Sequence, residues 1–173
     1  RGRFSRPKIS VDTRHPQTVA LALELGVDVN NDVSGLNDPA MVKLLAQSDC
    51  EVVLMHSLTI PADPRVTLPE DEANPSQWLA RWMENKLERL QHQGISRKRL
   101  ILDPGIGFGK TSLQSLKLLR ALKPLQALGC PLLAGHSRKS FFKDFSSVTA
   151  GDRDPETLGA SLALAAKGVD ILR

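Results

Sequence analysis

Polar and charged side chains follow short apolar runs at six places in this sequence of 173 residues. They are Asp12, Asn31 with Asp32, His56, Asp103, the Ser-Arg-Lys run at 137–139, and Arg173. Carboxylates accept hydrogen bonds, amides both donate and accept, and lysine and arginine donate to oxo groups and anions. If the fold brings them together, these side chains match a small heterocyclic ligand that presents both donors and acceptors.

The two aspartates in this set, Asp12 and Asp103, leave three roles open. They could form a general acid/base pair, bind a metal, or accept hydrogen bonds from the N–H groups of a ligand. Asn31 favours the third role, because a site built only from carboxylates is typical of a metal. His56 is expected to support the site rather than to bind the ligand itself.

The glycine-rich segment 103–111, Asp-Pro-Gly-Ile-Gly-Phe-Gly-Lys-Thr, superficially resembles a phosphate-binding loop. The spacing excludes that motif, because Pro104 stands where the first glycine is required. The glycines are instead expected to let the backbone and Phe108 approach a flat ligand closely.

The segment Gly135-His136-Ser137-Arg138-Lys139-Ser140 is similarly close to the nucleophile elbow of hydrolases. Lys139 replaces the second glycine of that turn, so Ser137 is not expected to act as a nucleophile. Ser, Arg and Lys at the start of a predicted helix would instead form an anion site from a hydroxyl, two cations and free backbone N–H groups. Such a site suits a carboxylate and a carbonyl oxygen.

Six apolar runs that alternate with helical patterns are predicted to be strands: 9–12, 27–31, 52–56, 100–103, 131–135 and 169–173. This alternation predicts parallel strands with right-handed crossovers. An open sheet would gather its ligand groups at one switch point, whereas nearly every strand here ends in polar residues. That pattern is typical of the C-terminal mouth of a parallel (β/α)8 TIM barrel.

A complete barrel of this kind has about 250 residues and eight strands. We therefore expect about six of the eight β/α units, in a single domain over residues 1–173. The missing parts are expected to be the first two units at the N-terminus and a short piece at the extreme C-terminus.

Proline marks four predicted helix starts, at His15-Pro16, Asp38-Pro39, Asn74-Pro75 and Asp154-Pro155, three of them with Asp or Asn as the expected cap. The helix predicted over about 75–93 carries an apolar stripe that indicates core packing. Both tryptophans are therefore expected to be structural rather than to bind a ligand. The proline-rich stretch 57–73 is expected to be a long, solvated loop.

Composition narrows the class of protein. No apolar run approaches the roughly 20 residues of a membrane helix, and residues 1–8 lack the apolar stretch of a signal peptide, so we expect a soluble, cytoplasmic protein. Cys50 and Cys130 are far apart and are expected to be buried thiols. The net charge of +4 is modest and spread out, which argues against nucleic acid as a partner.

Five segments together closely resemble the dihydropteroate synthases of the pterin-binding family, in the right order over almost the whole chain. They are Ser10-Val11-Asp12-Thr13, Asn31-Asp32-Val33, Leu54-Met55-His56, the stretch 102–110 from Leu102 to Lys110, and Gly135-His136-Ser137-Arg138-Lys139-Ser140. The glycine-rich and Ser-Arg-Lys segments are highly specific in combination.

The resemblance implies a transferase of folate biosynthesis, a sulfonamide target that condenses 6-hydroxymethyl-7,8-dihydropterin pyrophosphate with p-aminobenzoate. Asp12, Asp103 and Lys139 would be catalytic. The implied pterin contacts are Asp12, Asn31, Met55, Asp103, Phe108 and Lys139; those to p-aminobenzoate are Ser137 and Phe108; and Arg173 would bind the pyrophosphate.

The resemblance also implies a homodimer and the use of Mg²⁺, whose ligand loop would belong to a first strand that these residues do not include. No metal ligand can therefore be assigned among these residues. Two alternatives stay open: a pterin-dependent methyltransferase, against which the Ser-Arg-Lys run argues, and a catalytically inactive pterin-binding homologue.

Overall fold

The computed structural model describes residues 6–69, 74–147, 149 and 152–173. Within this part of the chain, parallel strands alternate with helices from end to end. The strands are β1 (Ser10–Asp12), β2 (Val29–Asp32), β3 (Glu51–Met55), β4 (Leu100–Asp103), β5 (Leu133–Ala134) and β6 (Ile171–Leu172). Every predicted strand is confirmed, with ends that shift by up to two residues.

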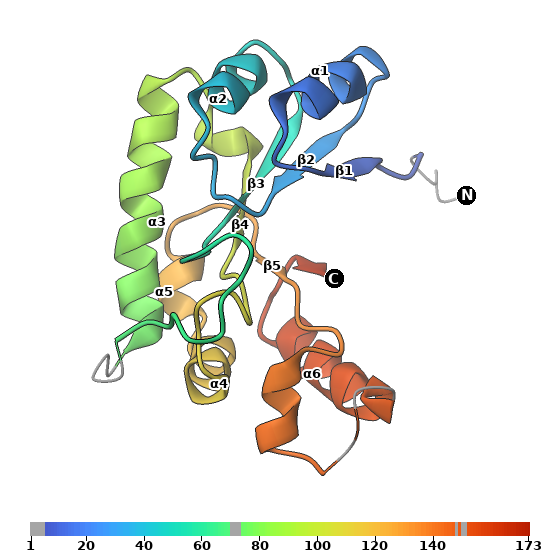
Figure 1. Cartoon of the computed structure of the whole chain (residues 1–173), viewed down its shortest axis with the longest axis vertical. Coiled ribbons are helices and arrows are strands. Elements are labelled where there is room, and N and C mark those ends of the chain that lie inside the picture. The colour runs from blue at the N-terminus through green and yellow to red at the C-terminus, as the bar shows by residue number, and fades with distance from the viewer. Residues whose placement is uncertain (1–5, 70–73, 148, 150–151) are drawn as a thin grey trace.

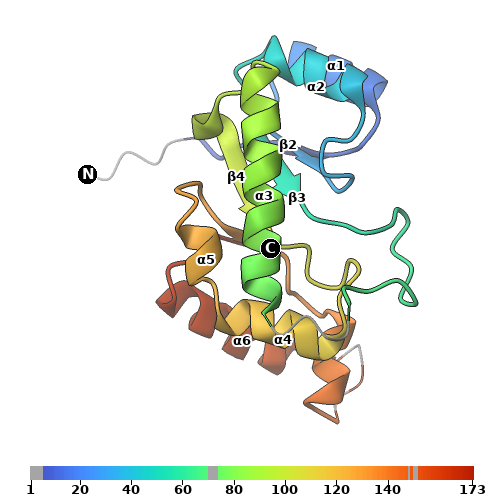
Figure 2. The same cartoon turned by 90° about the vertical axis from the view of Figure 1, so that its left-hand side faces the viewer.

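The helices lie between these strands in the order expected of β/α units. They are α1 (Pro16–Glu24), α2 (Pro39–Ala46), α3 (Pro75–His92), α4 (Ser112–Arg120), α5 (Lys123–Gln126) and α6 (Asp154–Ala166), with 3-10 turns η1 (Arg97–Arg99) and η2 (Ser140–Asp144). Figure 1 shows α1, α2 and α3 on one side of the sheet, and Figure 2 shows α3 running along its length.

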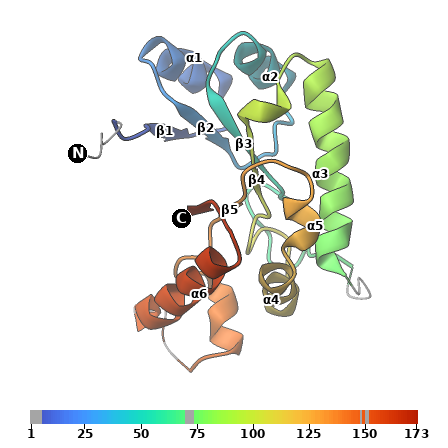
Figure 3. The same ribbon diagram turned by 180° about the vertical axis from the view of Figure 1, so that it is seen from behind.

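The strands are paired in the order in which they occur along the chain. β1 to β4 form one parallel sheet, and β5 pairs with β6. A bridge between Leu102 and Leu132 joins the two sheets, and the Leu102 N–H donates to Pro131 O at 2.8 Å. The result is a continuous arc of parallel strands (Figure 3), which is the larger part of a (β/α)8 barrel.

Side chains on the strands alternate between two cores, as the two-residue period of a strand requires. Val52 and Leu54 of β3 face outwards and join the large core that the helices cover. Val53 faces inwards, where one residue from each of β2 to β5 forms a second cluster: Val29, Val53, Ile101 and Leu133. This inner cluster is one layer of the barrel interior.

The predicted helix 75–93 is confirmed as α3, which buries Leu79, Met83, Leu87 and Leu90. Trp78 and Trp82 pack against the same core, in agreement with their expected structural role. Both cysteines are buried, free thiols, as predicted. No helix in the described segments is both long and apolar enough to span a membrane.

Two expectations about elements need correction. Asp154 is the first residue of α6 rather than its cap, which is Arg153, and its carboxylate pairs with Arg138 at 2.7 Å. The helix predicted to follow Lys139 is only the short 3-10 turn η2. A glycine at position 129 also predicts the end of a helix between β4 and β5, and two helices, α4 and α5, precede this glycine.

The loop 57–73, expected to be solvated, is largely exposed over its described part, 57–69, but is fixed to the protein at Leu68. Leu68 is 1% exposed, and its N–H donates to Gly109 O at 3.0 Å. Gln114 Nε2 donates to Leu68 O and to Pro69 O, both at 3.1 Å. The loop therefore packs against the glycine-rich segment, while residues 70–73 lie outside the described part.

Candidate active site

A cavity of about 380 Å³ opens at the C-terminal ends of the strands. Its walls come from the ends of β1 and β3, from β4, and from the segments that follow β2, β4, β5 and β6. The lining residues are Asp12, Val33, Met55, Asp103, Gly105, Ile106, Phe108, Gly135, Ser137, Lys139 and Arg173. In a parallel barrel this edge carries the chemistry, and all but one of the predicted site residues meet here.

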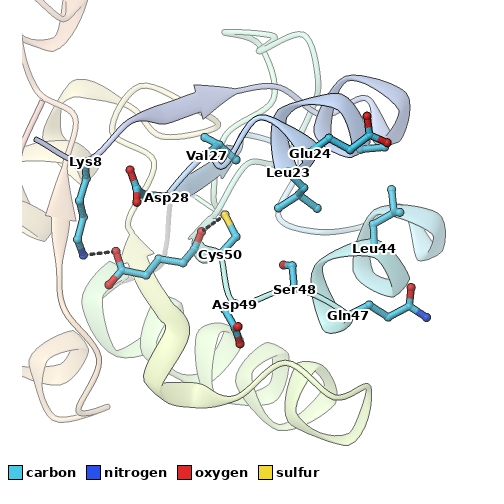
Figure 4. Close-up of a pocket in the computed structure, with 12 residues that line it drawn as sticks. Lys8, Leu23, Glu24, Val27, Asp28, Leu44, Gln47, Ser48, Asp49 and Cys50 are labelled. Atoms are coloured by element: carbon cyan, nitrogen blue, oxygen red, sulfur yellow. Dashed lines mark hydrogen bonds and ion pairs between the residues drawn. The ribbon is translucent and has the colours of Figure 1, made fainter. Parts of the chain in front are cut away.

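A larger and more open hollow of about 820 Å³ lies at the opposite ends of the strands. Figure 4 shows its lining side chains, among them Lys8, Asp28 and Cys50. None of the predicted site residues lines it, and the N-terminal face of a barrel is usually structural. We therefore place the candidate site in the smaller cavity.

Asn31 is the one predicted residue that does not line this cavity; it lines the barrel interior directly beside it. Its Nδ2 donates to Asp12 Oδ2 at 3.0 Å, and the Arg173 guanidinium donates to the same oxygen. These contacts fix the amide and leave Asn31 Oδ1 buried without a hydrogen-bond partner among the described residues. A buried acceptor of this kind suits a ligand N–H.

Asp103 lies at the centre of the site and is 3% exposed. Its Oδ1 accepts a hydrogen bond from the Gly105 N–H at 2.7 Å. Burial raises the pKa of this carboxyl, whereas the Gly105 bond and the charges of Lys110, Lys139 and Arg173 lower it. Within the described part of the chain, Oδ2 accepts no hydrogen bond and faces the cavity beside Gly135.

Gly105 makes this arrangement possible. Its φ is +64°, and a Cβ at this position would lie 1.9 Å from the backbone oxygen of His56. Only glycine fits, because a side chain would collide with the end of β3. The chain can therefore turn back so closely that the Gly105 N–H reaches Asp103.

Phe108 and Lys139 also line the cavity and lie against each other. Lys139 Nζ lies 4.4 Å from the centroid of the Phe108 ring, a cation–π geometry. Burial lowers the pKa of Lys139, and the charge of Arg173 lowers it further, while Asp103 raises it. A flat ligand in the cavity would meet an aromatic face and an ammonium group together.

The segment after β5 differs from the predicted anion site. Ser137 and Lys139 line the cavity, but Arg138 pairs with Asp154 outside it. The Ser137, Arg138 and Lys139 N–H groups donate to Arg173 O, Thr157 Oγ1 and His136 O respectively. The expectation of free N–H groups is wrong, because the sharp turn at Arg138, where φ is +51°, directs them into the protein.

Lys110 is a part of the site that the sequence reasoning did not single out. It is 7% exposed, and its Nζ lies 2.7 Å from His56 Nδ1, 2.9 Å from Phe108 O and 3.2 Å from His56 O. Burial lowers the pKa of Lys110 to about 7. His56 is buried beside Trp78 and Trp82 and does not line the cavity, in line with its expected supporting role.

A family model described as "Pterin binding enzyme" matches residues 1–173. The chain belongs to this family. The folate synthesis bifunctional protein of Chlamydia caviae is 38% identical over 173 residues, which are 99% of this chain and 38% of that protein.

Two solved structures of family members are similar throughout the chain. Dihydropteroate synthase from Anaplasma phagocytophilum with bound 6-hydroxymethylpterin-monophosphate has a TM-score of 0.90 at 37% identity, covering 96% of this chain and 65% of that one. The Thermus thermophilus enzyme in complex with 4-aminobenzoate has a TM-score of 0.87 at 36% identity, covering 96% and 64%. The chain therefore spans less than two thirds of each of these relatives.

Proposed function

We propose that this chain carries the pterin and p-aminobenzoate sites of a dihydropteroate synthase, an enzyme of folate biosynthesis. The observation that carries the proposal is the buried Asp103, whose second oxygen faces a cavity shared with Asp12, Phe108 and Lys139. The similar Anaplasma and Thermus enzymes hold a pterin phosphate and 4-aminobenzoate, which supports the same ligands here.

The pterin ring presents adjacent N–H donors on one edge and an oxo group with a ring nitrogen on another. Asp103 would accept from the N–H edge, Asn31 Oδ1 would accept a further N–H, and Lys139 would donate to the oxo side. Asp12 would keep the Asn31 amide oriented. Met55 and Phe108 would enclose the ring from its two faces.

The second substrate, p-aminobenzoate, would bind next to Phe108, with its carboxylate at Ser137. Its amine would then face the methylene carbon of the pterin. In the reaction the bond between that carbon and the pyrophosphate oxygen breaks, the amine nitrogen forms the new bond, and the amine loses a proton. Arg173 would bind the departing pyrophosphate, so the protein's contribution is positioning and charge stabilisation.

Mg²⁺ is part of the proposal only through the family resemblance. Among the described residues no group of three or more His, Cys, Asp or Glu side chains could hold a metal. The residues present do not fit a metal site, and we derive no step through one.

A cytoplasmic homodimer is the remaining part of the proposal. Leu158 and Leu162 of α6 are 62% and 65% exposed, an apolar surface that a second copy could cover. Light scattering of the full-length protein across a concentration series should give twice the monomer mass; a constant monomer mass would contradict the dimer.

The proposed activity is tested by pyrophosphate release from 6-hydroxymethyl-7,8-dihydropterin pyrophosphate, measured on the full-length protein. A synthase releases pyrophosphate in step with p-aminobenzoate consumption. Methyl transfer from methyltetrahydrofolate to a corrinoid protein would instead show the methyltransferase alternative. Tight pterin binding with neither reaction would show a catalytically inactive homologue.

A further inference from the structure

Lys110 is a buried cation that does not line the cavity but contacts Phe108, which does, and His56, which directly follows the lining residue Met55. Its Nζ lies within hydrogen-bond distance of Phe108 O and of both His56 O and His56 Nδ1. Phe108 belongs to the glycine-rich segment after β4, and His56 directly follows Met55 at the end of β3. One ammonium group therefore joins two segments, although Lys110 and His56 are 54 residues apart in the chain.

The same ammonium group lies behind Asp103. A Cβ on Gly105 would be 3.3 Å from Lys110 Nζ, so the lysine sits against the glycine whose N–H holds Asp103 Oδ1. The charged groups that act on Asp103 are Lys110 after β4, Lys139 after β5 and Arg173 after β6. Arg173 is paired with Asp12 and Lys139 faces the cavity, so Lys110 is the cation of the three that is enclosed by protein.

The glycine-rich segment is held in place by contacts on several sides, and Lys110 supplies one set of them. Gly109 packs so closely on Leu58 that a Cβ there would lie 2.6 Å from Leu58 Cγ. On its outer side the segment is held by the Leu68 N–H, which donates to Gly109 O. On the side facing β3, Lys110 supplies the side-chain contacts.

We propose that Lys110 is a positioning residue for the pterin site, which holds the Phe108 wall against the end of β3 and places a buried positive charge behind Asp103. This inference rests on the proposed function, because it assumes that an ionised Asp103 binds the pterin. Loss of the charge at Lys110 should then favour protonation of Asp103, which would remove its ability to accept two N–H groups.

The test is calorimetric titration of the full-length protein with 6-hydroxymethylpterin monophosphate over a series of acidic to neutral pH values. Lys110→Gln removes the charge and keeps a donor, and Lys110→Arg keeps the charge in a different shape. Lys117→Gln, on the exposed face of α4, is the matched control. Titration of the ligand itself is common to all four proteins and cancels in the comparison.

Lys110→Gln should weaken pterin binding by about tenfold at pH values below the Lys110 pKa of about 7, where the lysine is charged, since hydrogen bonds to a charged group are lost. It should also raise the pH at which half of the binding is lost by about one unit, the usual effect of removing an opposite charge near an Asp. Lys110→Arg should bind more weakly than wild type but keep the wild-type midpoint, and Lys117→Gln should match wild type in both. A role in folding alone would change the melting temperature without moving the midpoint.

Wild-type affinity and an unchanged midpoint in Lys110→Gln would overturn the inference and leave the proposed function standing. If the Gln variant does not fold, Lys110→Arg decides: a raised midpoint would overturn the inference, and weaker binding at the wild-type midpoint would support it. Absence of pterin binding in the wild type would defeat the proposed function, and the inference with it.

Discussion

Asp103 and His56 are titratable side chains that are buried away from water. Burial shifts the pKa of each one in the direction that favours its neutral form. For Asp103 the pKa is raised. For His56 it is lowered from 6.5 to about 3, first by burial and then by the charge of Lys110. A neutral His56 can accept a hydrogen bond from Lys110 at Nδ1, in agreement with their 2.7 Å separation.

His56 should make the stability of the protein depend on pH. Between its usual pKa of 6.5 and about 3, the unfolded chain binds a proton that the folded protein does not. Stability therefore falls as the pH drops through this window. Between about pH 7.5 and pH 5 the loss due to His56 should be about 2 kcal/mol.

Urea unfolding of the full-length protein at these two pH values tests this dependence. His56→Gln keeps an acceptor for Lys110 and should remove that part of the loss, whereas His92→Gln, on the exposed end of α3, should retain it. Equal losses in wild type and His56→Gln would show that His56 is not buried in its neutral form.

At the scale of elements, the segment after β4 depends on Gly105, which no other residue can replace. Gly105 and Gly129 have similar φ values of +64° and +72°, but a Cβ at Gly105 would meet His56 O at 1.9 Å, whereas one at Gly129 would meet nothing within 4 Å. A comparison of the two positions therefore distinguishes the cost of the left-handed backbone conformation from the cost of a steric clash.

Gly129→Ala should lower the free energy of unfolding by about 1 to 2 kcal/mol, the cost of holding alanine in the left-handed conformation. Gly105→Ala should cost at least about 2 kcal/mol more, because β3 or the glycine-rich segment must move. It should also abolish pterin binding, since the Asp103 hydrogen bond to Gly105 depends on the same turn. Chemical denaturation and pterin titration of both variants measure the difference; equal costs with intact binding would contradict the tight turn.

The segment after β5 leads to a prediction about inhibitors. Sulfonamides present an aryl amine opposite an acidic group, as p-aminobenzoate does opposite its carboxylate. They should therefore compete with p-aminobenzoate beside Phe108 and Ser137. Steady-state inhibition of the full-length protein, with p-aminobenzoate as the varied substrate, should give a competitive pattern. A purely non-competitive pattern would place the acid-binding site elsewhere.

Strands and proline-initiated helices could be predicted from the sequence because their signals are local. Helix α4 has a local signal as well, the capping box between Thr111 and Gln114. The cavity residues could be predicted because polar residues at the C-terminal ends of parallel barrel strands meet at one face of the barrel. The Lys110 contacts and the outward turn of Arg138 could not be predicted, because they arise from tertiary packing and from left-handed backbone at Gly105 and Arg138.

At the scale of the whole molecule, the arc of strands has two edges, β1 and β6, joined at the mouth by the side chains of Arg173 and Asp12. Between them a cavity of about 650 Å³ runs along the barrel interior, lined by Val29, Val53, Ile101 and Leu133. In a closed barrel such edges are paired and the interior is filled with side chains.

The 173-residue chain produced alone is accordingly predicted neither to unfold cooperatively nor to make dihydropteroate. Each large apolar side chain left in water forgoes about 1.5 to 3 kcal/mol, and a few such losses equal the typical stability of a domain, about 5 to 15 kcal/mol. Circular dichroism melting and a synthase assay, with the full-length protein as control, test both parts. A sharp transition with turnover would show that the arc is sufficient.

The proposed function requires that the mouth of the barrel binds a pterin through an ionised Asp103. Asp103→Asn replaces one oxygen, which accepts hydrogen bonds, by an NH₂ group, which donates them, and removes the charge. Asp49→Asn, exposed at the opposite ends of the strands, is the matched control. Calorimetric titration of the full-length protein with 6-hydroxymethylpterin monophosphate should show a loss of about 2 to 4 kcal/mol in Asp103→Asn and none in Asp49→Asn. Equal pterin affinity in wild type and Asp103→Asn would contradict the account.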